Sequence, residues 1–159
     1  MMNPLSVFES TEFKKRLLQH AVGLIEQRMT AAAHAMEAAQ AASNAEEKSS
    51  AGDKYETSRA MGHLEKEMYS RQLEANRREL EALYNIDCLN RYQTASTGSI
   101  IQTDESFFFI AAGLGKISFE GKDIYMLSPH APVARQLYGK RKGDTFTFNK
   151  MENKITNVF

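Results

Sequence analysis

The chain has 159 residues, which is enough for one ordinary domain or for a small domain with an extended appendage. Its 20 Lys and Arg balance its 20 Asp and Glu, so no net charge draws it onto bare nucleic acid or an anionic membrane, and we expect DNA binding to be weak or absent. The chain has a single cysteine, Cys88, which excludes an intramolecular disulfide. It has no apolar core of a signal peptide, and no apolar run approaches the roughly 18 residues that span a membrane. We therefore expect a cytoplasmic protein without membrane contact.

The segment from Thr11 to Ser43 predicts a first long helix. It contains no Pro and only one Gly, and at about 1.5 Å per residue it would extend roughly 50 Å. Its second half is rich in Ala, whose small side chain would let a partner helix approach closely. Apolar residues recur at helical spacing, at Phe13, Leu17, Ala21, Leu24, Ala31, Ala35, Ala38 and Ala42.

A second helical pattern of similar length begins near Asp53 and ends near Tyr84. Two such helices joined by a short polar segment predict an antiparallel coiled-coil hairpin over residues 1–84, with an acidic tip near residues 44–56. The apolar positions of the second pattern are Met61, Leu64, Met68, Ala75 and Ala82, flanked by Leu73, Leu80 and Leu83.

After Tyr84 the helical pattern fades, and residues 85–98 are typical of a linker. Residues 99–159 then change character: short β-branched or aromatic runs are divided by Gly, Asp and Asn, and Pro132 to Tyr138 alone predicts a helix. We expect a small, mostly antiparallel sheet with one helix, and therefore an α+β protein. The predicted strands are 99–102, 106–112, 116–119, 122–127, 145–148 and 154–158.

Asp53 and Glu56 stand at the break between the two helical patterns. Their D-x-x-E spacing is that of a capping box, in which the two side chains satisfy backbone N–H groups. The alternative is that both carboxylates offer oxygen ligands to Mg²⁺ and that another molecule completes the metal site. Tyr55, between them, would either pack on a partner or cover the end of the coiled coil, and the sequence favours neither.

Three arginines on the second helix, Arg71, Arg77 and Arg78, have two interpretations. They could form a basic strip that contacts the backbone of a nucleic acid. Because glutamates are interleaved with them, we expect them to pair with these neighbours on the helix surface instead.

The run from Ala131 to Asp144, APVARQLYGKRKGD, resembles the Ser-Pro-x-Ala-Arg-x-Leu-x-Gly-Lys-x-x-Gly-Asp signature of the C-terminal domain of GreA/GreB transcription elongation factors. Ala131 stands where that family has serine. The resemblance implies an FKBP-like fold for residues 99–159 and docking at the rim of the RNA polymerase secondary channel. By this resemblance, Ala131 and Pro132 are candidates for partner binding.

The tip, Gly52-Asp53-Lys54-Tyr55-Glu56, is similar to the family's Gly-Asp-Leu-Ser-Glu-Asn-Ala-Glu-Tyr opening. The resemblance implies that Asp53 and Glu56 enter the polymerase active site, help to hold a shared Mg²⁺ and stimulate cleavage of backtracked RNA, with contact to nascent RNA possible. On this hypothesis the protein is an accessory factor, not an enzyme, and binds no cofactor tightly.

Two rival hypotheses stay open at the level of sequence. A related protein could occupy the channel and regulate synthesis without stimulating cleavage. Alternatively, the chain is a coiled-coil adaptor for an unrelated partner, in which Asp53 and Glu56 only cap a helix.

Overall fold

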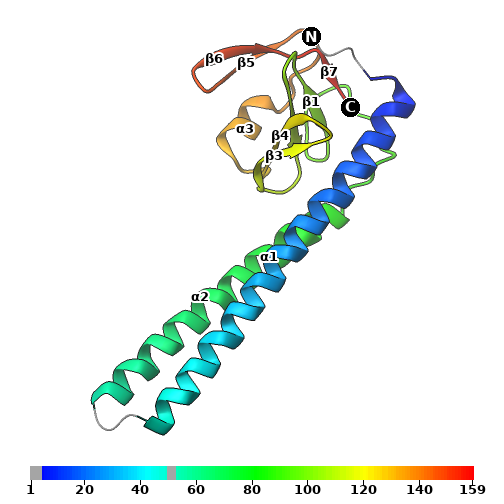
Figure 1. The fold of residues 1–159 in the computed structure, drawn as a ribbon. Helices are drawn as coiled ribbons and strands as arrows, with labels where there is room; N and C mark the ends of the chain where they lie inside the picture. The colour runs from blue at the N-terminus through cyan, green and yellow to red at the C-terminus, as the bar shows by residue number, and fades with distance from the viewer. Residues whose placement is uncertain (1–4, 50–52) are drawn as a thin grey trace. The chain divides into compact units, whose positions relative to one another are not determined.

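The computed structural model describes residues 5–49 and 53–159, with the side chains of all of these except residues 46–49 and 53–55. It confirms the predicted α+β class, with two long helices followed by a small sheet and a short helix (Figure 1). The elements are α1 (Val7–Ser49), α2 (Asp53–Tyr84), β1 (Ile100–Gln102), β2 (Ser106–Ile110), β3 (Gly115–Phe119), β4 (Lys122–Leu127), α3 (Pro132–Leu137), β5 (Thr145–Phe148), β6 (Met151–Lys154) and β7 (Asn157–Val158).

The chain divides into two compact units. Of the described residues, 23–49 and 53–80 form the first, which we call the hairpin unit, and 5–22 with 81–159 form the second, which we call the sheet unit. The first turns of α1 thus group with the sheet. Within the range predicted as a linker, Ala95 is buried, and its backbone bonds to Lys140 and Gly139.

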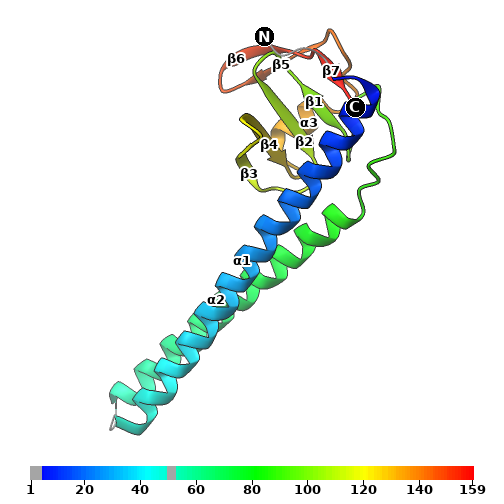
Figure 2. The same cartoon turned by 45° about the vertical axis from the view of Figure 1, so that its right-hand side comes forward.

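In the hairpin unit, α1 and α2 lie side by side and antiparallel, as Figures 1 and 2 both show. Ser70 Oγ lies 3.7 Å from Met36 Sδ, and a Cβ added at Gly62 would lie 3.1 Å from Ser43 Oγ. The small residues at the second contact let the two backbones approach closely. This confirms the predicted helical hairpin.

The apolar positions predicted on α1 do not all lie on its buried face. On α1 the face turned inward contains Ile25 and Ala32, whereas Ala31 and Ala38 are exposed. The predicted spacing loses register between Leu24 and Ala31. Ala occurs at so many positions in this stretch that its pattern does not distinguish one face of the helix from the next.

Helix α1 begins four residues before the predicted start at Thr11, and it runs past Ser43 to Ser49. At its start, Ser6 N–H donates to Glu9 Oε2 (2.8 Å), and Glu9 N–H donates to Ser6 Oγ (3.2 Å). This reciprocal pair is a capping box, which satisfies two N–H groups that the first turn leaves without a helical acceptor. The Ser6-x-x-Glu9 spacing explains why the helix begins at Val7 and not at Thr11.

Five strands form the main sheet in the order β3-β4-β2-β1-β7, and β5 and β6 form a separate hairpin. All pairs are antiparallel except β2 with β4, which is parallel. Residues Asn149 and Lys150, with φ of 52° and 63°, make the tight turn between β5 and β6. Residues 155–156 then separate β6 from β7, where the sequence predicted one strand over residues 154–158.

Strand β2 is buried on both faces of the sheet. Phe108 packs on one side against Phe146 (ring centroids 5.1 Å apart), in a cluster that includes Leu137 of α3. On the other side Phe107 packs against Phe13 of α1, with centroids 5.0 Å apart. The continuous apolar run of β2 is the pattern expected of a strand covered on both faces.

Candidate functional site

The predicted acidic tip falls at the loop end of the helical hairpin. Helix α1 ends at Ser49 and α2 begins at Asp53, so Glu56 lies in the first turn of α2, where its side chain is exposed. Gly52 lies outside the described residues, as do the side chains of Asp53 and Tyr55. The capping role of Asp53 and the packing of Tyr55 therefore stay predictions.

The tip offers carboxylate chemistry that suits a hard divalent cation. Carboxylate oxygens are ligands that Mg²⁺ accepts, but Mg²⁺ requires an octahedral set of oxygens, and two carboxylates supply only part of it. In the described part of the chain, no group of three or more His, Cys, Asp or Glu side chains could hold a metal ion. The donor set thus fits a metal only if another molecule supplies the remaining ligands.

A row of apolar side chains is exposed on α2 beyond the tip. Met61, Leu64 and Met68 are 56%, 62% and 46% exposed. Their spacing of three and four residues places them on one face of the helix. The sequence identified these residues only as apolar positions at helical spacing. In the structure each keeps about half of its side chain in contact with solvent, and Met61 also lines a hollow beside Ala39 and Ala42 of α1.

The arginines of α2 pair with neighbouring glutamates, as predicted. Arg71 lies 3.8 Å from Glu67, and both Arg77 and Arg78 lie within 3.7 Å of Glu74. All of these side chains are largely exposed, so each pair contributes little to stability. The pairing reduces the positive charge that a nucleic-acid backbone would meet on this helix.

The other predicted site lies at the start of α3. Ala131 is the N-cap residue, with φ −62° and ψ 145°, and no side chain caps the helix there. Pro132 follows in the first turn, where the missing N–H of proline costs no helical hydrogen bond. Pro132 is exposed, whereas Ala131 is half-buried against the core of the sheet unit.

Most residues of the signature-like run have a role within the sheet unit. Ala134 and Leu137 are buried in its core. Gly143 has φ +95°, a conformation that favours glycine, and Asp144 Oδ2 accepts the N–H of Arg141 at 2.9 Å. Pro132 is the start of a helix and, like the neighbouring Arg135, is exposed. Both positions are therefore accessible to a partner.

Sequence reasoning missed Lys14, which is only 1% exposed. Its Nζ donates to Gly98 O (2.8 Å) and lies 4.9 Å from the centre of the Tyr92 ring. Burial lowers the pKa of Lys14 to about 8, although the nearby Cys88 and Asp87 act in the opposite direction. Lys14 stands four residues after buried Ser10 and three before buried Leu17, which places it on the buried face of α1. This spacing could have indicated from the sequence that Lys14 is buried.

No helix in the described ranges is both long enough and apolar enough to cross a membrane. Comparison of the chain with protein-family models, with curated proteins and with solved structures finds no match.

Proposed function

We propose that this protein binds RNA polymerase through the secondary channel and promotes cleavage of backtracked RNA. The observation that carries the proposal is the exposed Glu56 at the loop end of two long antiparallel helices. A helix of 32 residues extends about 48 Å, which suits a probe that reaches into a deep channel. The resemblance of residues 131–144 to the GreA/GreB signature supports the same partner.

The tip residues would complete a metal site that belongs to the polymerase. Asp53 and Glu56 would each offer carboxylate oxygens to the shared Mg²⁺. When bound, the metal supplies an activated water molecule and neutralises charge on the phosphate that is attacked. The chain's own contribution is to carry both acids in the first turn of one helix.

The remaining contacts would hold the factor on the polymerase. Pro132 and Ala131 would dock at the channel rim together with exposed Arg135. The apolar row Met61, Leu64 and Met68 would contact the channel wall. Tyr55, between the tip acids, would pack on the polymerase near the active site.

The test is RNA cleavage by a stalled, backtracked polymerase complex from the same organism. It compares the unmodified protein with the Asp53→Asn/Glu56→Gln variant. The matched control is Asp104→Asn/Glu105→Gln, which removes one Asp and one Glu from exposed positions of the sheet unit. We expect the tip variant to lose stimulation by at least tenfold while competing for polymerase as well as the unmodified protein does, and the control to retain both properties.

Other outcomes separate the rival hypotheses. Polymerase binding without stimulated cleavage by the unmodified protein would replace the proposal with a channel-occupying regulator. Absence of polymerase binding would overturn both and favour the adaptor hypothesis. An Arg135→Glu variant that bound polymerase normally would contradict the proposed docking at the start of α3.

A further inference from the structure

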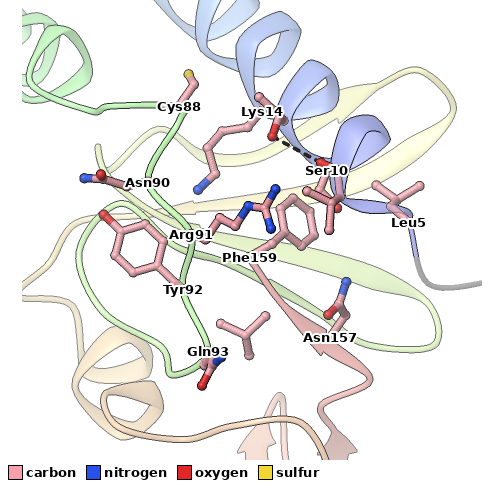
Figure 3. A pocket seen from close by; sticks show the side chains of 13 residues that line it. Leu5, Ser10, Lys14, Cys88, Asn90, Arg91, Tyr92, Gln93, Asn157 and Phe159 are labelled. Atoms are coloured by element: carbon pink, nitrogen blue, oxygen red, sulfur yellow. Dashed lines mark hydrogen bonds between the residues drawn. The ribbon is translucent and has the colours of Figure 1, made fainter.

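A cavity of about 210 Å³ lies within the sheet unit, where the first turns of α1, the segment 88–93 and the end of the chain meet (Figure 3). Its apolar wall contains Leu5, Val158 and the ring of Phe159. It is smaller than the roughly 300–1,000 Å³ of pockets that hold drug-sized ligands. Its size therefore suits a small ligand.

The polar part of the cavity wall carries positive charge. Lys14 and Arg91 both line it, and none of the described Asp and Glu side chains does. Arg91 is exposed, and no ion pair among the described residues involves either cation. Neutral side chains that can donate hydrogen bonds lie around the two cations, among them Ser10, Asn90 and Asn157.

Lys14 is buried, and no carboxylate of the described residues is in hydrogen-bond contact with it. Figure 3 shows its side chain running from α1 toward the segment that carries Asn90 and Tyr92. One N–H of its ammonium group donates to Gly98 O, and the rings of Tyr92 and Phe159 lie 4.9 and 5.9 Å away. Removing a cation from water costs free energy unless an opposite charge compensates it. The lowered pKa of Lys14 agrees with this incomplete compensation.

We propose that this cavity binds a small organic anion, a carboxylate or a phosphate monoester, that carries an apolar body. The anionic group contacts Lys14 and Arg91, and the apolar body lies against Leu5, Val158 and Phe159. Such a ligand supplies the charge that buried Lys14 lacks and covers apolar surface that is otherwise in contact with water. This site is independent of the hairpin tip and of the proposed function.

The test uses three probes of similar size, phenylacetate, phenyl phosphate and neutral benzyl alcohol, with the full-length protein in isothermal titration calorimetry. We expect at least one anion to bind tenfold or more tightly than benzyl alcohol. Whichever anion binds more tightly shows whether the site prefers a carboxylate or a phosphate monoester. The Arg91→Gln variant should weaken anion binding at least fivefold. Arg28→Gln, which removes an exposed arginine of the hairpin unit outside the cavity, should leave binding unchanged.

Proton linkage gives a second readout that ordinary surface binding would not produce. A bound anion favours the charged form of Lys14 and so raises its pKa from about 8. Near pH 8.5 binding should then take up protons, which calorimetry in buffers of different ionisation enthalpy measures. The Lys14→Met variant should lose this uptake, and circular dichroism checks that it folds.

The proposal is overturned if neither anion binds more tightly than benzyl alcohol, or if Arg91→Gln binds the anions as tightly as the unmodified protein. Because Arg91 is exposed, its replacement tests the site even if Lys14→Met does not fold.

Discussion

The hairpin unit and the sheet unit bury their side chains to very different extents. Among the described residues of the hairpin unit, Ile25 and Ala32 are the only buried hydrophobic side chains. The sheet unit buries the large rings of Phe13, Phe107 and Phe108 completely. Because apolar burial is the main favourable contribution to folding, the sheet unit has the stronger core of its own.

The contrast indicates a division of roles. The hairpin exposes Met61, Leu64 and Met68 on one face of α2, which leaves apolar surface available to a partner. In the sheet unit the apolar residues pack mainly against one another. Its unusual feature is a buried cation, Lys14, whose charge is not balanced by a carboxylate in hydrogen-bond contact among the described residues. Substitutions in the two units should therefore change the stability of the protein by different amounts and for different physical reasons.

The largest expected effect is the loss of a ring from the sheet unit. Phe108 contacts the rings of Tyr125, Phe146 and Phe148, so Phe108→Ala should lower the free energy of unfolding by about 3–5 kcal/mol. Urea unfolding followed by tyrosine fluorescence measures the change. Met151→Ala, at a side chain 69% exposed, is the control and should change stability by about 0.5 kcal/mol or less. Equal effects of the two substitutions would contradict the contrast between core and surface.

The next effect concerns Lys14 and pH. Its pKa is about 8 in the folded protein, against an ordinary value of 10.5. Between these values the unfolded chain binds more protons than the folded protein, so the free energy of unfolding should rise with pH, by about 3 kcal/mol in full. Lys14→Met should lack this rise, as urea unfolding at pH 7.5, 9 and 10.5 would measure.

Lys15→Met is the matched control for this pH effect, because Lys15 is exposed and pairs with Glu12. Its stability should follow the pH dependence of the unmodified protein. Parallel curves for the unmodified protein and Lys14→Met would show that burial does not shift the proton equilibrium of Lys14.

A smaller effect is expected in the hairpin unit, and it should be stabilising. A Cβ at Gly23 would meet nothing within 4 Å, so Gly23→Ala should raise stability by about 0.8–1 kcal/mol through helix propensity. Gly62→Ala should gain less, since its Cβ would lie 3.1 Å from Ser43 Oγ. Thermal unfolding followed at 222 nm compares the two. A larger gain at Gly62 would contradict the close approach of the helices there.

The smallest effect concerns an ion pair at the surface of the sheet unit. Arg16 Nε and Nη2 donate to Glu120 Oε1 and Oε2 at 2.6 and 3.1 Å. The hydrogen bond from Arg16 holds the pKa of Glu120 below its ordinary value. The pair therefore stabilises the fold above pH 4.5, and this contribution is lost as the pH falls through the lowered pKa.

Glu120→Gln should lower the melting temperature slightly at low salt, and 1 M NaCl should remove most of the difference because both side chains are partly exposed. A difference that persisted unchanged in 1 M NaCl would show that packing, and not charge, accounts for it.

The elements of the sheet unit were largely predictable. Strands β4 and β5 have the predicted bounds, and α3 ends one residue before the predicted end. Short aromatic and β-branched runs between turn residues are a strong local signal. The separate strand β6 was missed because Asn149 and Lys150 adopt positive φ, which their residue types do not require.

The candidate site was predictable in part. The position of Glu56 at the start of a helix follows from the break between two helical patterns. The exposure of Met61 and Leu64 did not follow, because apolar residues at helical spacing are assigned to the buried face by default. The pairing of α1 with α2 determines which face is inward, and a single helix does not contain that information.

By itself, the sequence determined two long helices, a turn between them that is flanked by acids, and a small sheet, since these depend on local spacing and turn chemistry. Only the tertiary structure decided that the first turns of α1 group with the sheet, that Lys14 is buried beside a cavity and that α2 exposes an apolar row. These features depend on contacts between residues far apart in the chain, such as Phe13 with Phe107 and Lys14 with Gly98. Local patterns do not specify which distant partner a side chain meets.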